Sequence, residues 1–496
     1  MQELVASISS AYVAACLPAI YAVYNCKSYF VVTRELHAVA RFFRRQSKFS
    51  QIALFACITQ RERNIMLAEA YKIPYPALPL ELCDQIIDYL WDNPRALAAC
   101  GATSREWVPT SRLHLFRRAV VHCGPRCRTF QDLLETSPLS PVAVAPYVHE
   151  LVISRERPPP LEDYLSEDED DWTNESLLSV LFYLDQVECL TLRSLQPEDL
   201  DIEARVCLGT FSPSIHTLHM ESVEFKAGIV LRHLLFGFPR LESVSLRSVT
   251  WEHWKKPTDG LETASNSEGK IQIHKLVVEE MLHSERHRSH GGIEAITNRH
   301  RAGVPFQFSL RHLEWSSHAS DKQCNILNGL LREAGTSLRT FKISFHPRTD
   351  EQVYLNDKLN LLANTRLENL QIVCPRDGYT MVQCAWVPML LNRINSTQFR
   401  EVRMVFGSCG FQEIFVGFLD WELTDQALAA LGERVPQLAI VFQIGRQDEV
   451  MNEYVMTAIT ARLPQVRARE MRIGMSVTCS VVVDEAVFSR ELLQWW

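Results

Sequence analysis

Three nine-residue segments of this 496-residue chain repeat one pattern of apolar and polar residues, and this repeat limits the folds open to the chain. The segments are 187–195, 215–223 and 241–249, so their starts lie 28 and 26 residues apart, and each segment ends in serine followed by leucine or valine. Apolar and polar residues alternate in them, which is typical of a strand with one buried face. Since one such unit cannot bury its apolar face alone, the pattern predicts stacked repeats.

Looser copies of the pattern extend the repeat along the chain, starting at Val148, Ile273, Leu310, Leu338, Leu367, Phe399 and Val435. Helix-like stretches lie between copies, at 177–184, 230–236 and 425–433. The period and the alternation of strand with helix resemble those of leucine-rich repeats. The sequence therefore predicts the α/β class, with a curved solenoid and a parallel inner sheet over residues 148–496.

Four charged residues occupy the same position in successive copies: Arg193, Glu221, Arg247 and Glu279. Because neighbouring strands lie about 4.8 Å apart, this order predicts opposite charges side by side on the open face of the sheet. The row is either a recognition surface or a self-neutralised ladder that only stabilises the sheet. We favour the ladder, because like charges in register would be costly.

A phosphorylated ligand needs cationic side chains that lack such acidic partners. Lys342 and Arg403, with Gln371 between them at the same register, are the best candidates for binding a target protein on this criterion.

Composition argues against several classes of protein. The formal net charge of −8 has the wrong sign for a protein held mainly by nucleic-acid phosphates, so no nucleic-acid partner is expected. Glycine is scarce, at 19 residues, and the chain lacks the glycine-rich phosphate loops and the zinc-protease and serine-hydrolase motifs. We therefore expect a non-catalytic protein without a cofactor.

The 14 cysteines are scattered, most of them among apolar residues, which favours a reducing compartment, cytoplasmic or nuclear. Cys123 and Cys127 could be half of a zinc site, but no second pair follows at a suitable spacing. A loop with His283, His287, His290 and His300 lacks matching cysteines or carboxylates, so no metal is expected.

Residues 1–75 form a separate N-terminal segment. Residues 4–26 carry no charge and basic residues follow, which suits a membrane anchor in length. Several polar residues dilute this stretch, so we favour a helical extension that is buried or poorly ordered.

Residues 76–118 predict three short helices. Pro79 suits the first turn of a helix on which Leu82, Ile86 and Leu90 recur every four residues, with Ile87 widening the stripe. Asp92 or Asn93 could cap a second helix that has Pro94 in its first turn, Leu97 and Cys100 inside and Gly101 at its end. Trp107, Ser111 and Leu115 have helical spacing in a third segment, which Pro109 must restart or kink.

This stretch resembles an F-box. The resemblance rests on Leu78-Pro79, Glu81-Leu82, Ile86-Ile87, Leu90, Leu97, Cys100 and the ending Arg105-x-Trp107, followed by a run from Arg112 to Phe116 that is similar to fungal members. The resemblance implies docking on a Skp-type adaptor of a cullin–RING ubiquitin ligase. It also implies which residues face that adaptor, namely Leu78, Pro79, Leu82, Ile86, Ile87 and Leu90, while Leu97, Cys100 and Trp107 form the F-box core.

The expected organisation is thus an extension over 1–75, an F-box over 76–118, a connector over 119–147 and a solenoid over 148–496. The function it implies is a substrate receptor, in which the F-box binds the Skp-type adaptor and the repeats bind a target protein. The alternative is a repeat scaffold for protein–protein interaction outside any ligase, anchored to a membrane through residues 4–26.

Overall fold

The computed structural model describes residues 80–495 with the exception of 92, 123–124, 137–143, 156–173, 197–207, 209–213, 228–230, 232–233, 236, 254–270, 280–305, 319, 347–358, 375–383, 385, 407–418, 446–448 and 484–485. The chain divides into two compact units, the first ending at Ala119 and the second beginning at Val120. Each unit is considered by itself.

The described part of the first unit contains four helical segments: α4 (Leu80–Asp88), α5 (Pro94–Thr103), the 3-10 turn η1 (Arg105–Trp107) and α6 (Val108–Phe116). Asn93 caps α5, because its side-chain oxygen accepts the N–H of Ala96 at 3.1 Å. Ser104 separates α5 from η1 and accepts the N–H of Glu106. Pro109 lies in the first turn of α6, where a missing N–H costs nothing, so it starts the third helix.

Gly101 does not end the second helix, contrary to the expectation from the sequence. Helix α5 continues to Thr103, and the only glycine with a positive φ among the described residues is Gly335. A Cβ atom at Gly101 would lie 3.5 Å from the Cβ of Ser111 on α6, which is an ordinary contact distance. Gly101 is therefore a place where two helices pack closely rather than a C-cap.

The second unit is built on one large sheet. Its strands are β1 (Arg118–His122), β2 (Glu150–Ser154), β3 (Cys189–Arg193), β4 (Thr217–Glu221), β6 (Ser243–Arg247), β8 (Ile271–Glu279), β9 (Phe306–His318), β10 (Thr340–His346), β11 (Asn369–Cys374), β12 (Glu401–Phe406), β13 (Ala439–Gly445), β14 (Arg472–Val483) and β15 (Ala486–Trp495). Strands β5 (Glu224–Ala227) and β7 (Thr250–His253) form a small second sheet.

The large sheet follows the order of the sequence. Every pairing from β2 to β14 is parallel, and β14 and β15 pair in the antiparallel sense. Each of the looser copies identified in the sequence contains or adjoins one of these strands. The sheet starts with β1, which spans the boundary between the two units. Its first residue, Arg118, is the last of the predicted F-box, and its other residues lie in the predicted connector.

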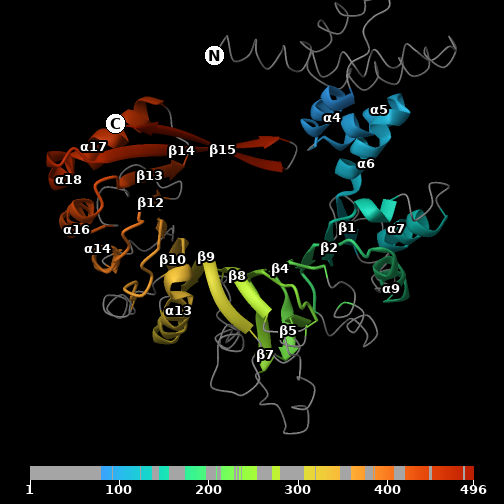
Figure 1. Cartoon of the computed structure of the whole chain (residues 1–496), viewed down its shortest axis with the longest axis horizontal. Helices are drawn as coiled ribbons and strands as arrows, with labels where there is room; N and C mark the ends of the chain where they lie inside the picture. Colours follow the sequence, from blue (N-terminus) through green and yellow to red (C-terminus); the bar gives the residue numbers. More distant parts are fainter. Residues whose placement is uncertain are drawn as a thin grey trace, which may run out of the picture. The chain divides into compact units, whose positions relative to one another are not determined.

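Helices follow the strands in this unit: α7 (Pro125–Thr136), η2 (Ala145–Tyr147), α9 (Asn174–Tyr183), α13 (Asp321–Ala334), η7 (Gly335–Ser337), α14 (Trp386–Asn392), α16 (Trp421–Arg434), α17 (Glu449–Ala461) and α18 (Pro464–Ala468). Two of the predicted helical stretches lie in α9 and α16, whereas most of 230–236 is outside the described residues. In Figure 1, α13, α14 and α16 lie on the outer side of the strands. The fold is a leucine-rich-repeat-like α/β solenoid.

Alternation along the strands separates the core from the open face. Buried side chains in register include Leu190 and Leu192 on β3, Leu218 and Met220 on β4, Phe341 and Ile343 on β10, and Leu370 and Ile372 on β11. Because side chains of a strand point alternately to opposite faces, these rows pack under the helices and the residues between them face outward.

The serine shared by the three clearest repeats has a conformational explanation. Ser194, Ser222 and Ser248 have φ of 50°, 53° and 54°, the left-handed region that side-chain-bearing residues seldom adopt. This turn lets each serine N–H donate to the next strand, to the carbonyls of Glu221, Arg247 and Glu279 respectively, at 2.7–2.9 Å. The repeated serine therefore marks the point where the backbone leaves the sheet.

Replacing Ser222 by glycine should raise the free energy of unfolding by about 0.5–1 kcal/mol, because glycine adopts a positive φ without steric cost. Urea denaturation followed by circular dichroism measures the change. The matched variant is Ser243→Gly at the first residue of β6, which should lower the free energy of unfolding by a similar amount because glycine loses more conformational freedom on folding than serine does. Equal destabilisation by both variants would show that the turn at Ser222 is not strained.

Arginines link successive repeats on the helical side. Arg393, Arg434 and Arg469 each donate from a guanidinium nitrogen to a backbone carbonyl 34 to 40 residues earlier, on Leu359, Ile394 and Ala429. The contacts couple each repeat to the one before it.

Candidate protein-interaction surfaces

The first unit has a very small core. Among its described residues, Ile87, Leu97 and Cys100 form one buried apolar cluster, and Leu90, Trp107 and Leu115 pack against them. Cys83, Ser111 and Ala119 are buried outside this cluster. The apolar area that this cluster removes from water is small, so the three helices around it are marginally stable by themselves.

Polar contacts connect the first and third helices of this unit. Thr110 donates its hydroxyl to Asp84 at 2.6 Å, and the ring of His114 lies 2.8 Å from a carboxylate oxygen of Asp88. Cys83 lies on the same helix as the two carboxylates, and burial raises the pKa of its thiol. Its sulfur therefore serves as a packing group rather than a nucleophile.

Large apolar side chains remain exposed on the first unit. Tyr89 and Trp91, just after α4, are 84% and 64% exposed, and Leu80 and Leu82 on α4 are 47% and 46% exposed. Leu113 on α6 is also exposed. We call these five residues the apolar set of the first unit. Several large exposed apolar side chains on so short a segment are typical of a surface that another protein covers.

The residues assigned to adaptor binding fall into three groups in the structure. Leu82 is exposed and Ile86 half-buried, so both are accessible to a partner. Ile87 is 1% exposed and the partly buried Leu90 packs on the core, so these two side chains face the inside of the unit. Leu78 and Pro79 lie outside the described residues.

Helical spacing in the sequence marked the core residues of the first unit, but it did not mark the exposed aromatic residues. Leu97 and Cys100 lie in the core, as their helical spacing predicts, and Trp107 packs against it. Tyr89, Trp91 and Leu113 were not singled out. Tyr89 and Trp91 are the chain neighbours of Leu90, which belongs to the apolar stripe. Their position beside the stripe, and not in it, was the feature of the sequence that could have predicted their exposure.

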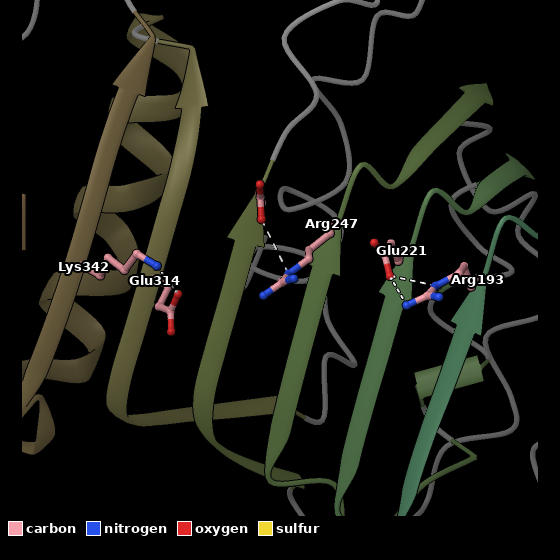
Figure 2. Close-up of polar contacts among 6 residues, drawn as sticks. Arg193, Glu221, Arg247, Glu314 and Lys342 are labelled. Carbon is pink, nitrogen blue, oxygen red and sulfur yellow. Dashed lines mark hydrogen bonds and ion pairs between the residues drawn. The ribbon is translucent and has the colours of Figure 1, made fainter. Parts of the chain in front are cut away.

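The row of alternating charges on the open face has the predicted register. Arg193 is paired with Glu221, Glu221 with Arg247, and Arg247 with Glu279 on successive strands. Ion pairs join Arg193 to Glu221 at 2.9 Å and Arg247 to Glu279 at 3.5 Å (Figure 2). These four side chains neutralise one another, as expected of a ladder.

Lys342, Gln371 and Arg403 also share one row across β10, β11 and β12. Along each strand, this row lies two residues before the row that contains Arg193. Contrary to the expectation from the sequence, both cations have acidic partners: Lys342 lies 3.0 Å from Glu314 on β9 (Figure 2), and Arg403 lies 2.9 Å from Glu401 on its own strand. The criterion that selected them, cations without acidic partners, is therefore not met.

Glu314 is the most strongly perturbed carboxylate on the open face. A hydrogen bond from His312 at 2.8 Å and the charge of Lys342 hold the pKa of Glu314 at about 2, against an ordinary 4.5 and in spite of partial burial. Glu314 is therefore ionised at neutral pH, and a phosphate at Lys342 would have to compete with this carboxylate.

His219 lies on the same face, two strands before β8. Burial, assisted by the charges of Lys275 and Arg247, lowers the pKa of His219. The imidazole of His219 is therefore neutral at pH 7, and it adds no charge to the open face of the sheet.

Few of the residues that the sequence connects with a metal site or a membrane span are among the described residues. In the part of the chain that the structure describes, no group of three or more His, Cys, Asp or Glu side chains could hold a metal ion. Cys123 and the histidines 283, 287, 290 and 300 lie outside that part. No helix within the described ranges is long and apolar enough to cross a bilayer, and residues 4–26 are not among them.

Comparison with known proteins gives no family assignment. No protein-family model matches the chain, and no curated protein sequence matches it. Among solved structures, a chain of the Rad7–Elc1 complex from yeast is 15% identical, with a TM-score of 0.31 over 79% of this chain and 92% of that chain. The leucine-rich-repeat-containing protein LegL7 from Legionella pneumophila is 10% identical, with a TM-score of 0.32 over 71% of this chain and 93% of that chain. At these TM-scores neither likeness carries a conclusion, and the solenoid is established by its own strand order and register.

Proposed function

We propose that this protein is the non-catalytic substrate receptor of a Skp–cullin–F-box type ubiquitin ligase. In this proposal the first unit is an F-box that binds a Skp-type adaptor, and the solenoid binds the target protein. The receptor would hold the target beside the conjugating enzyme that carries ubiquitin as a thioester. This proximity raises the effective concentration of the target's lysines and so increases the rate of transfer.

One observation carries the proposal. A stretch whose sequence resembles an F-box folds as three short helices around an apolar cluster of three buried residues, Ile87, Leu97 and Cys100, and leaves five large apolar side chains exposed. A structural helical hairpin would bury such side chains against its own chain. Their exposure fits a segment that a second polypeptide completes.

Target binding is assigned to the open face of the sheet, with Gln371 between the Lys342 and Arg403 ion pairs as the centre of the candidate surface. Because the cations there already have carboxylate partners, an unmodified segment of a target suits this surface better than a phosphorylated one.

The full chain co-expressed with a Skp-type adaptor should purify as a stoichiometric complex. Leu82→Asp should weaken that complex at least 30-fold, because it places a charge in an apolar contact that forms only on binding. Size-exclusion chromatography and calorimetric titration of the purified proteins measure stoichiometry and affinity.

Phe182→Asp is the matched control, because Phe182 on α9 is 83% exposed and belongs to the second unit. It should leave the affinity for the adaptor unchanged. If neither variant alters binding, or if the wild-type chain binds no Skp-type adaptor, the protein is a repeat scaffold that acts outside a ligase.

A further inference from the structure

Two cysteines meet at the junction between β11 and α14. Cys374 is the last residue of β11 and Cys384 lies two residues before α14 begins. The thiol of Cys384 donates to the sulfur of Cys374 at a sulfur–sulfur distance of 4.0 Å, and both side chains are buried. The two sulfurs are thus in contact without any movement of the chain.

Each of the two cysteines has a backbone contact with a described neighbour. Cys374 pairs in register with Phe406 on β12, and the carbonyl of Cys384 accepts the N–H of Val387 in the first turn of α14 at 3.0 Å. Trp386, two residues after Cys384, is buried and packs edge to face against Phe345 of β10. Cys374 therefore lies on a paired strand and Cys384 is hydrogen-bonded to the first turn of α14. A covalent bond requires the sulfur–sulfur distance to shorten from 4.0 Å to about 2.05 Å.

We propose that Cys374 and Cys384 form a reversible disulfide when the protein meets an oxidising thiol–disulfide buffer. The bond would tie the end of β11 to the start of α14 and close the link of nine residues, 375–383, between them. The proposal is independent of ligase function, since it concerns only the covalent state of one repeat.

Glutathione disulfide is the oxidant in this step. The thiolate of Cys374, the acceptor in the sulfur–sulfur contact, attacks one glutathione sulfur, forms a mixed disulfide and releases one glutathione thiol. The thiolate of Cys384 then attacks the Cys374 sulfur and expels the second glutathione. Two protein thiols lose two electrons and two protons, and one glutathione disulfide becomes two glutathione thiols.

Closing a short link removes conformational freedom from the unfolded chain, so the oxidised protein should be more stable. We expect its melting temperature to rise by about 3 °C relative to the reduced protein. Because both thiols are buried, the exchange requires local opening around the pair and should take hours rather than seconds.

The test incubates the purified full chain in buffers of defined ratio between glutathione disulfide and glutathione. Remaining thiols are alkylated in denaturant, and peptides are mapped by mass spectrometry. A peptide that links residues 374 and 384 should accumulate to more than half of the chains in the most oxidising buffer and should disappear after dithiothreitol is added. Absence of this peptide from folded wild-type protein after a day overturns the proposal.

Cysteine variants distinguish this bond from oxidation elsewhere among the 14 cysteines. Cys374→Ala and Cys384→Ala should each abolish the rise in melting temperature on oxidation. Cys324→Ala, at a buried cysteine of α13, should keep it. A rise that persists in Cys384→Ala would assign the effect to other cysteines and contradict the proposal.

Discussion

Replacing Glu314 by glutamine should lower the free energy of unfolding by about 2–3 kcal/mol at pH 7. The pKa of this carboxyl is about 2 in the folded chain against an ordinary 4.5, and one pKa unit corresponds to about 1.4 kcal/mol. The cause is local: His312 donates to the carboxylate and Lys342 lies 3.0 Å away. Glutamine keeps the shape of the side chain and removes its charge.

The effect of Glu314→Gln should depend on pH in a defined direction. Because the pKa is lowered on folding, the carboxylate stabilises the folded state fully above about pH 4.5, and this contribution is lost as the pH falls from 4.5 towards 2. Urea denaturation measures the free energy of unfolding of wild type and variant at several pH values from 7 to 2.5. The two free energies should therefore approach each other as the pH falls.

Glu221→Gln is the matched control for this prediction. Glu221 also pairs with a cation on a neighbouring strand, but the side chains of Arg193 and Glu221 are 35% and 42% exposed, so its loss should cost at most about 1 kcal/mol. A constant difference between wild type and Glu314→Gln from pH 7 to pH 3 would show that the folded pKa of Glu314 is not lowered.

Replacing Asp425 by alanine should lower the free energy of unfolding by about 3 kcal/mol. Asp425 lies within α16 and is 2% exposed, yet its carboxylate accepts the N–H groups of Gln465 and Val466 at 2.9 and 3.0 Å. These groups open the short helix α18, whose N-cap residue Leu463 offers no side-chain acceptor. Without the carboxylate they lose a charge-assisted partner in a buried place, which is costly.

The comparison for this variant is Asp420→Ala. Asp420 caps its own helix α16 through the N–H of Leu423 at 3.0 Å, at an exposed position, so alanine there should cost only about 1 kcal/mol. Thermal unfolding of the two variants gives the difference. Equal losses would mean that Asp425 does not hold α18 in place.

The sequence anticipated the solenoid because its signals are local and repeated. Alternation within nine residues marks the buried face of each strand, and a constant period fixes which residues become neighbours. Arg193, Glu221, Arg247 and Glu279 could therefore be placed in one row from their spacing alone. The acidic partner of Arg403 was visible in the same way, since Glu401 lies two residues earlier on the same strand and thus on the same face.

Other features could not be read from the pattern. The stripe in α4 correctly marked apolar residues, but it could not tell that Ile87 turns inward while Leu82 stays exposed, because this depends on where α5 and α6 pack. The role of Gly101 likewise depended on the approach of Ser111 from the next helix. Local spacing describes one helix face and not the neighbour that covers it.

What the sequence determined by itself is the strand repeat and the serine turns, because both arise from interactions within a few residues. What only the tertiary structure decided is which charges and polar groups find partners. Asp425 reaches the N–H groups of a helix 40 residues further along. Such contacts depend on how whole repeats stack, and the side chains of a single repeat do not specify them.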